Sequence, residues 1–176
     1  TDKIFIKSEN TQSIFKSIIN YFILGIQHIV PKGLDHILFI VGLFFFSLTL
    51  RPLLIQVTMF TIAHSITLIF VSVSYINVNS LIVEPIIALS IAYVGIENVF
   101  RKYVKEYLRY IIIFFFGLLH GLGFALVLSD IGYQSSKLIV NLISFNLGIE
   151  AAQIFIILSL YVLFGIKFSN KKYYRY

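Results

Sequence analysis

The chain is a succession of long apolar runs separated by short polar segments. The runs are residues Ile14–Val30, Leu34–Leu50, Leu53–Ile76, Leu81–Phe100, Tyr110–Leu128 and Leu138–Ile166. A bilayer core about 30 Å thick needs about 20 residues of α-helix, with a range of about 17–25, and the runs fit that length. Strands of a membrane barrel would be shorter and would alternate in polarity. The pattern predicts an all-α integral membrane bundle of about six transmembrane helices over residues 14–166, with a polar N-terminal tail or stub (1–13) and a basic cytoplasmic tail (167–176).

The composition supports a chain surrounded by membrane lipid. It is 59% hydrophobic and 12% charged, whereas an ordinary soluble domain has about 25% charged residues. The length of 176 residues corresponds to one domain. The absence of cysteine excludes disulfides, thiolate metal ligands and cysteine nucleophiles, so a bound metal would need nitrogen and oxygen ligands. We expect no nucleic acid partner despite the net charge of +6, because the basic residues lie in short segments between the apolar runs.

The distribution of lysine and arginine predicts the orientation in the membrane. With six spans, Lys32 and Lys137 lie on one side and the other twelve of the 14 lysines and arginines lie on the opposite side. The positive-inside rule then places both termini, including the C-terminus, in the cytoplasm. The predicted location is the bacterial inner (cytoplasmic) membrane, as a multi-pass protein. If the first run is re-entrant, the N-terminus moves outside and the remaining spans keep their orientation.

Ionisable side chains inside these runs are the candidate functional residues. A charge in the hydrocarbon costs several kcal/mol, so such residues usually face the bundle interior and mark a site. They are His28, Asp35, His36, His64, Glu84, Glu97, His120 and Glu150. A rise of about 1.5 Å per residue puts His28, Asp35 and His36 near the outer face of the membrane. It puts His64, His120 and Glu150 near the middle, Glu84 near the outside and Glu97 near the inside.

Further polar residues form stripes at helical spacing. One stripe in the third run contains Thr58, Thr61 and His64, and one in the last run contains Asn146, Glu150 and Gln153. Glycines 117 and 121 flank His120, and small residues at this spacing let helices approach closely. Imidazole and carboxylate without thiolate suit Zn²⁺, Ni²⁺, Co²⁺, Mn²⁺ or Fe²⁺. The same residue types would also suit a proton relay.

Each residue also has a purely structural interpretation. A single histidine in a membrane helix can serve as a hydrogen-bonding link to a neighbouring helix. Asp35 can cap the second helix and Glu84 the fourth, because acidic residues favour helix N-termini. The coincidence of all four histidines with Asp35, Glu97 and Glu150 favours a shared functional site.

Five sequence blocks resemble the second branch of the HupE/UreJ family. They are HIVPKGLDHILF (28–39), FTIAHSITL (60–68), VEPIIALSI (83–91), FGLLHGLGFA (116–125) and FNLGIEAAQ (145–153). The family comprises small polytopic membrane proteins that are encoded with nickel hydrogenases or ureases and are regarded as nickel or cobalt permeases. The resemblance implies that His28, Asp35 and His36 match the first histidine block, where metal is proposed to enter, and that His120 matches the second. Six residues separate His28 from Asp35, where the better-studied branch has five, and that branch has a glutamate after its histidine–glycine pair that this chain lacks.

The predicted function is a permease for a divalent transition-metal cation, with Ni²⁺ or Co²⁺ as cargo. Its predicted pathway runs from His28, Asp35 and His36, through His64, His120 and Glu150, to Glu97. Ligands distributed in depth would allow the ion to enter and to leave.

Two alternatives stay open. In an intramembrane hydrolase of lipid or peptide, Zn²⁺ would be held by ligands at one depth from among Asp35, His36, His64 and His120, with Glu150 as general base. In an accessory subunit of a membrane complex, or a homo-oligomer, the polar residues would contact other helices.

Overall fold

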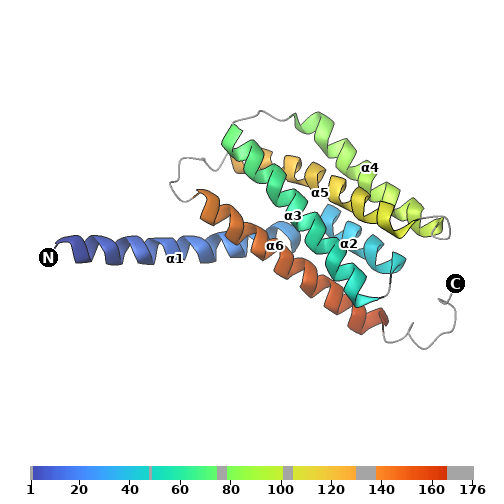
Figure 1. Ribbon diagram of the computed structural model, residues 1–176, viewed down its shortest axis with the longest axis horizontal. Coiled ribbons are helices and arrows are strands. Elements are labelled where there is room, and N and C mark those ends of the chain that lie inside the picture. Colours follow the sequence, from blue (N-terminus) through green and yellow to red (C-terminus); the bar gives the residue numbers. More distant parts are fainter. Residues whose placement is uncertain (1, 48, 75–78, 101–104, 130–137, 166–176) are drawn as a thin grey trace.

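The computed structural model describes residues 2–47, 49–74, 79–100, 105–129 and 138–165, which form helices and contain no strand. The elements are α1 (Asp2–Ile29), α2 (Leu34–Phe46), α3 (Leu50–Ser74), α4 (Ser80–Val99), α5 (Glu106–Ser129), α6 (Leu138–Leu160) and a π-helical turn η2 (Tyr161–Gly165). The helices pack lengthwise into one bundle (Figure 1). The predicted all-α membrane bundle is therefore confirmed.

The first two helices differ from the other four in how they fit a membrane. By length and composition, α3, α4, α5 and α6 are each able to cross, whereas Ile14–Ile29 and α2 qualify only as a pair bent by 68°. The 13 residues of α2 extend about 20 Å, which is less than the hydrocarbon thickness of about 30 Å. Pro31 and Gly33 in the break explain why the helix stops, because neither residue favours a helix interior. The described helices thus provide four crossings, or five if the bent pair is one broken span.

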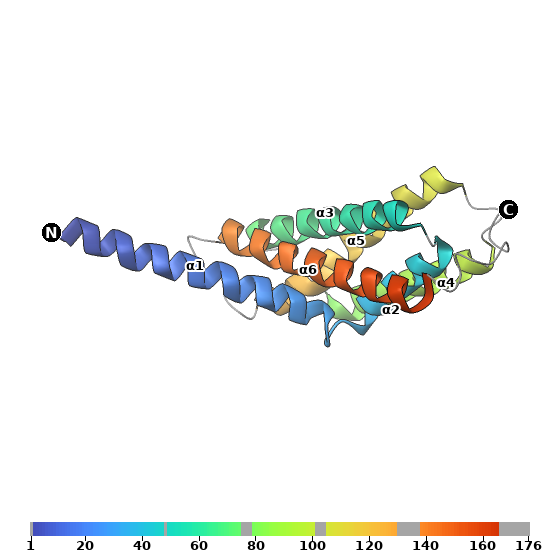
Figure 2. The same ribbon diagram turned by 90° about the horizontal axis from the view of Figure 1, so that it is seen from below.

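Contacts with α6 show that the bent pair runs the length of the bundle in the same direction as α6. The Ser17 hydroxyl of α1 donates to Oδ1 of Asn141 near the start of α6 at 2.8 Å. The ring of Phe45 near the end of α2 lies 6.2 Å from the ring of Phe164 in η2. The start of α1 and the end of η2 consequently lie at opposite ends of the bundle (Figure 2). The six-span expectation had placed both ends of the chain on one side.

The two predicted tails differ in what the structure says of them. Residues 2–13, expected to be a polar tail or stub, continue α1 as helix and project beyond the other helices (Figure 1). The predicted cytoplasmic tail, 167–176, lies outside the described residues.

Glycines set how closely the helices approach one another. A Cβ atom added at Gly25 of α1 would overlap the carbonyl oxygen of Phe145 in α6. A Cβ atom at Gly121 of α5 would lie 2.6 Å from the carbonyl oxygen of His64 in α3. Close packing of this kind is typical of small residues in membrane helices. It brings α1 against α6 and α5 against α3 at the level of the histidines.

Candidate metal centre

All four histidines meet in the middle of the bundle, each supplied by a different helix. The ring centroids of His28 (α1) and His36 (α2) are 4.8 Å apart, and those of His36 and His120 (α5) are 5.0 Å apart. His64 (α3) lies 6.0 Å from His28 and 6.2 Å from His36 by the same measure. One nitrogen atom from each of His28, His36 and His64 lies within 4.8 Å of the other two. This spacing is small enough for one metal ion to be reached by several rings after small side-chain movements.

The structure corrects the expected depths of these residues. His28 and His36 were expected near the outer face and His64 and His120 near the middle, yet the four rings lie at one level. The reason is the break between α1 and α2, which are bent by 68°: the pair runs along α6 from Ser17 to Phe45, so His28 and His36 lie partway along the bundle.

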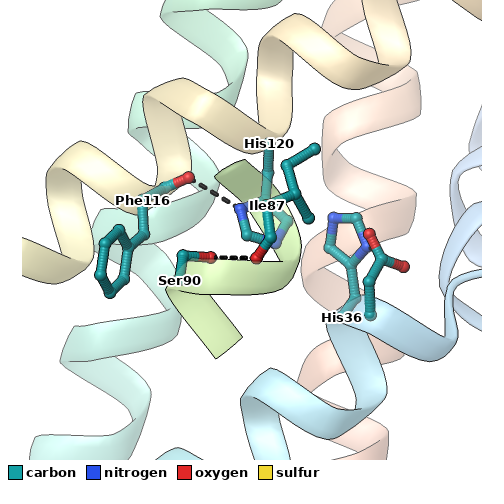
Figure 3. A network of polar contacts seen from close by, with 6 residues as sticks. His36, Ile87, Ser90, Phe116 and His120 are labelled. Atoms are coloured by element: carbon teal, nitrogen blue, oxygen red, sulfur yellow. Dashed lines mark hydrogen bonds and ion pairs between the residues drawn. The ribbon is translucent and has the colours of Figure 1, made fainter. Parts of the chain in front are cut away.

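Oxygen atoms lie near Nδ1 of three of the rings. The Nδ1 contacts are Asn146 Oδ1 at 3.2 Å for His64, the Phe116 carbonyl oxygen at 2.8 Å for His120, and Asp35 Oδ1 at 3.1 Å for His36. The first two are hydrogen bonds and the third is an approach at ion-pair distance. Figure 3 shows the ring of His120 bonded to Phe116, with His36 beside it. A carbonyl oxygen only accepts, so Nδ1 of His120 carries the proton and Nε2 keeps its lone pair.

Among the described residues, nothing forms a hydrogen bond to the opposite side of any of the four rings. Within the described residues, the Nε2 atoms of His28, His36, His64 and His120 are buried and have no hydrogen-bond partner. A buried polar atom left unpaired costs about 1–3 kcal/mol. Metal-binding histidines in proteins are held in this way, with one ring nitrogen bonded to an oxygen and the other facing the ion. His64 and His120 show this arrangement, and the four buried Nε2 lone pairs together fit a bound divalent cation, which would satisfy them.

A cavity of about 340 Å³ leads to the cluster and carries charged residues of both signs. Its lining includes His28, His36 and His120, together with Asp35, Glu84 and Lys32. A cation that approaches the histidines through the cavity would first meet the oxygen atoms of these two carboxylates. Two apolar clusters, one containing Phe124 and the other Phe60, flank the rings. The histidines therefore lie between two apolar parts of the core.

The cavity changes the interpretation of both proposed caps. Asn79, whose side chain accepts from the backbone N–H of Leu81 at 3.0 Å, caps α4. The expectation that Glu84 caps this helix is therefore wrong, and Glu84 instead lines the cavity. Asp35 lies in the first turn of α2, after the N-cap Gly33, where an acidic residue is favourable, and it lines the cavity as well. The sequence left the role of Glu84 open between a cap and a site, because Glu84 lies on a different face of α4 from Ser90 and Glu97.

Glu150 lies in the bundle but apart from the rings. Its Oε1 atom accepts a hydrogen bond from the Thr58 hydroxyl at 2.5 Å. Thr58 precedes His64 by six residues of α3, which is about 9 Å along the helix. The two predicted polar stripes on α3 and α6 face each other, as the hydrogen bond from Thr61 to Gln153 at 2.8 Å also shows. The structure thus separates Glu150 from the histidine cluster.

Glu97 is placed still farther away and is paired with a cation. It forms a buried ion pair with Arg109, whose guanidinium carbon lies 3.5 Å from the ring centroid of Phe46. Arg109 is fully buried, although the sequence assigned it to a charged segment outside the bilayer. The helix α5 begins at Glu106, before the apolar run begins, and this earlier start carries Arg109 into the bundle.

Comparison with known proteins identifies one family. A family model described as HupE / UreJ protein matches residues 2–176, which is nearly the whole chain. Comparison with curated proteins and with solved structures gave no match.

Proposed function

The chain belongs to the HupE/UreJ family, and from this premise we propose that it is a permease for a divalent transition-metal cation, with Ni²⁺ or Co²⁺ as cargo. The family is associated with nickel and cobalt uptake. The observation that carries the proposal is the set of four buried histidine Nε2 atoms without hydrogen-bond partners. Imidazole nitrogen is a preferred ligand for Ni²⁺ and other borderline divalent ions.

The proposed route begins at the cavity. Asp35 and Glu84 would attract the hydrated ion, and the rings of His28, His36, His64 and His120 would then replace its water. The ion would leave along the seam between α3 and α6, where Glu150 lies. Glu97 is not included in this route, because Arg109 already neutralises its charge.

We further propose an orientation with the C-terminal end of the bundle in the cytoplasm of a bacterial inner membrane. The helices α3 and α5 begin at the end of the bundle where α6 finishes (Figure 1). Arg51 lies in the first turn of α3, and Lys105 immediately precedes α5. The positive-inside rule favours the cytoplasmic side for this end. The cavity, near the break between α1 and α2, would then be reached from the outer half of the membrane.

One observation favours the hydrolase as a second candidate. The four histidines lie at one level, which is the arrangement expected for a single zinc ion with an open position for water. When bound, zinc would supply an activated water for hydrolysis. Glu84 and Asp35 line the same cavity and are better placed than Glu150 to accept a proton there. The accessory-subunit alternative has no comparable observation in its favour.

Metal content and transport, measured on the same preparations, test the proposal. Wild type, His36→Ala and His120→Ala would be purified, assayed by mass spectrometry for bound metal, and reconstituted in liposomes for Ni²⁺ and Co²⁺ uptake. Ser72→Ala is a matched control, because within the described residues its buried hydroxyl bonds only the Leu68 carbonyl of its own helix, at 2.6 Å. We expect each histidine variant to lose at least about tenfold in uptake and the control to keep it. Normal transport by both histidine variants would refute the permease. One tightly held zinc ion without transport would favour the hydrolase.

A further inference from the structure

We propose that the seam between α3 and α6 contains a second cation site, built from oxygen atoms around Glu150, which receives the ion from the histidine cluster. This inference rests on the proposed transport function. The second site differs from the first in its ligand atoms. Between His64 and the start of α3, the seam offers carboxylate, amide and hydroxyl oxygens.

The geometry of the seam is a ladder of paired polar side chains. His64 pairs with Asn146, Thr61 donates to Gln153, and Thr58 donates to Glu150. The three members on α3 are spaced by three residues, so they follow one face of the helix in steps of about 4.5 Å. The first pair of this ladder contains His64, which also belongs to the histidine cluster. A continuous series of polar atoms thus leads away from the cluster through otherwise apolar helices.

Glu150 has a coordinating atom that the ladder does not use. Thr58 occupies Oε1, whereas Oε2 is buried and has no hydrogen-bond partner among the described residues. No Lys, Arg or His forms an ion pair with Glu150 in the described part of the chain. A carboxylate at this depth is costly unless something compensates it. A divalent cation passing between α3 and α6 would supply that compensation.

The order of the two sites gives the ion a direction of release. Transition-metal ions such as Ni²⁺ prefer imidazole to carboxylate or carbonyl oxygen, so the oxygen site would bind the ion more weakly than the histidines do. Conduction requires sites that bind strongly enough to admit the ion and weakly enough to release it. A nitrogen site beside the cavity followed by an oxygen site farther along the seam between α3 and α6 meets both requirements.

A purely structural role for the ladder predicts different behaviour on substitution. Glu150→Gln keeps the shape of the side chain and an amide oxygen that accepts from Thr58, so the link between α3 and α6 persists. It removes the negative charge, so the cation site is lost. Thr58→Val has the opposite effect, since it removes the hydrogen bond and leaves the carboxylate.

The experiment measures Ni²⁺ stoichiometry by calorimetry in detergent and Ni²⁺ uptake into liposomes that contain a fluorescent chelator. We expect wild type to bind about two ions, one tightly and one weakly. Glu150→Gln should lose the weak ion, keep the tight dissociation constant within about twofold, and lose at least about tenfold in uptake. Thr58→Val should keep both ions. His120→Ala should lose the tight ion.

Each contrary result has a separate meaning. A single ion bound by wild type, or unchanged uptake by Glu150→Gln, would overturn the second site and leave the permease intact. Loss of the tight ion in Glu150→Gln would also overturn it, because Glu150 would then belong to the histidine site. Absence of uptake by wild type would refute the permease itself, while the stoichiometry would still decide whether a second site exists.

Discussion

The amide oxygen of Asn146 lies 3.2 Å from Nδ1 of His64 and joins α6 to the histidine cluster. The amide nitrogen of Asn146 donates to the Leu142 carbonyl oxygen at 2.8 Å, so the oxygen, not the nitrogen, faces the ring. This orientation fixes the proton of His64 on Nδ1 and leaves the Nε2 lone pair directed to the cluster. In the proposed metal site, Asn146 would thus be a positioning residue for His64.

Replacing Asn146 should weaken metal binding without removing a ligand. Asn146→Leu keeps the volume of the side chain but removes the acceptor, so His64 can rotate or change tautomer. Loss of such a supporting bond typically lowers metal affinity about 10–100-fold, and we expect a change in that range for Ni²⁺ by calorimetry. Ser144→Ala, which removes a bond within α6 itself, is the control. Equal affinities for the two variants would show that Asn146 does not position His64.

The helices and the polar interior were predictable from the sequence, because both follow from local pattern. Long apolar runs can satisfy their backbone in a bilayer only as helices. Polar residues at positions such as Thr58, Thr61 and His64 share a helix face by spacing alone. The pairing of this face with the stripe on α6 supplies hydrogen-bond partners that lipid does not offer.

The depths and partners of individual charges were not predictable, because they depend on how the helices are bent and packed. The depth of His36 depends on the bend between α1 and α2, and Pro31 predicts a break there but not its angle. The partner of Glu97 is Arg109, which is distant enough in sequence that only the packing of α4 on α5 brings them together. The position of Glu84 in the cavity depends on where α4 begins, and the boundary of a helix is less certain than its existence.

Because α1 lies so close to α6, even an alanine in place of Gly25 should destabilise the protein. Gly25→Ala introduces a methyl group that overlaps the Phe145 carbonyl oxygen, and overpacking of this kind costs about 1–3 kcal/mol. We expect a lower thermal unfolding temperature in detergent and weaker Ni²⁺ binding, because α1 carries His28. Gly95→Ala is the matched control in α4, since a Cβ atom there meets nothing within 4 Å. If the two variants unfold at the same temperature, the close packing is not needed.

The buried pair of Glu97 and Arg109 should matter for stability more than for metal binding. Glu97→Leu deprives the buried guanidinium of its carboxylate, and breaking a buried ion pair from one side costs about 3–5 kcal/mol. The double variant Glu97→Leu/Arg109→Met should regain much of this loss, because it buries no charge. Chemical unfolding would measure the stability of both.

The Ni²⁺ affinity of the same two variants separates a structural role from a ligand role. Arg109 precedes His120 by 11 residues of α5, which is about 16 Å along the helix. We therefore expect the affinity at the histidines to stay within about twofold of wild type. A tenfold loss of affinity in Glu97→Leu, with stability preserved, would instead place Glu97 on the metal route.

The path of α1 and α2 predicts an outward-facing N-terminal end. The chain contains no cysteine, so single substitutions can be labelled without background by a reagent that does not cross the membrane. Ser80→Cys, at the start of α4, should react in intact cells, whereas Lys105→Cys should react only after permeabilisation. Ser13→Cys, in α1, is the informative position: if the bent pair crosses the membrane once, it should react in intact cells, as Ser80→Cys should. Reaction of Ser13→Cys only after permeabilisation would mean that α1 and α2 cross separately or turn back, and the rings of His28 and His36 would then need another way to reach His64.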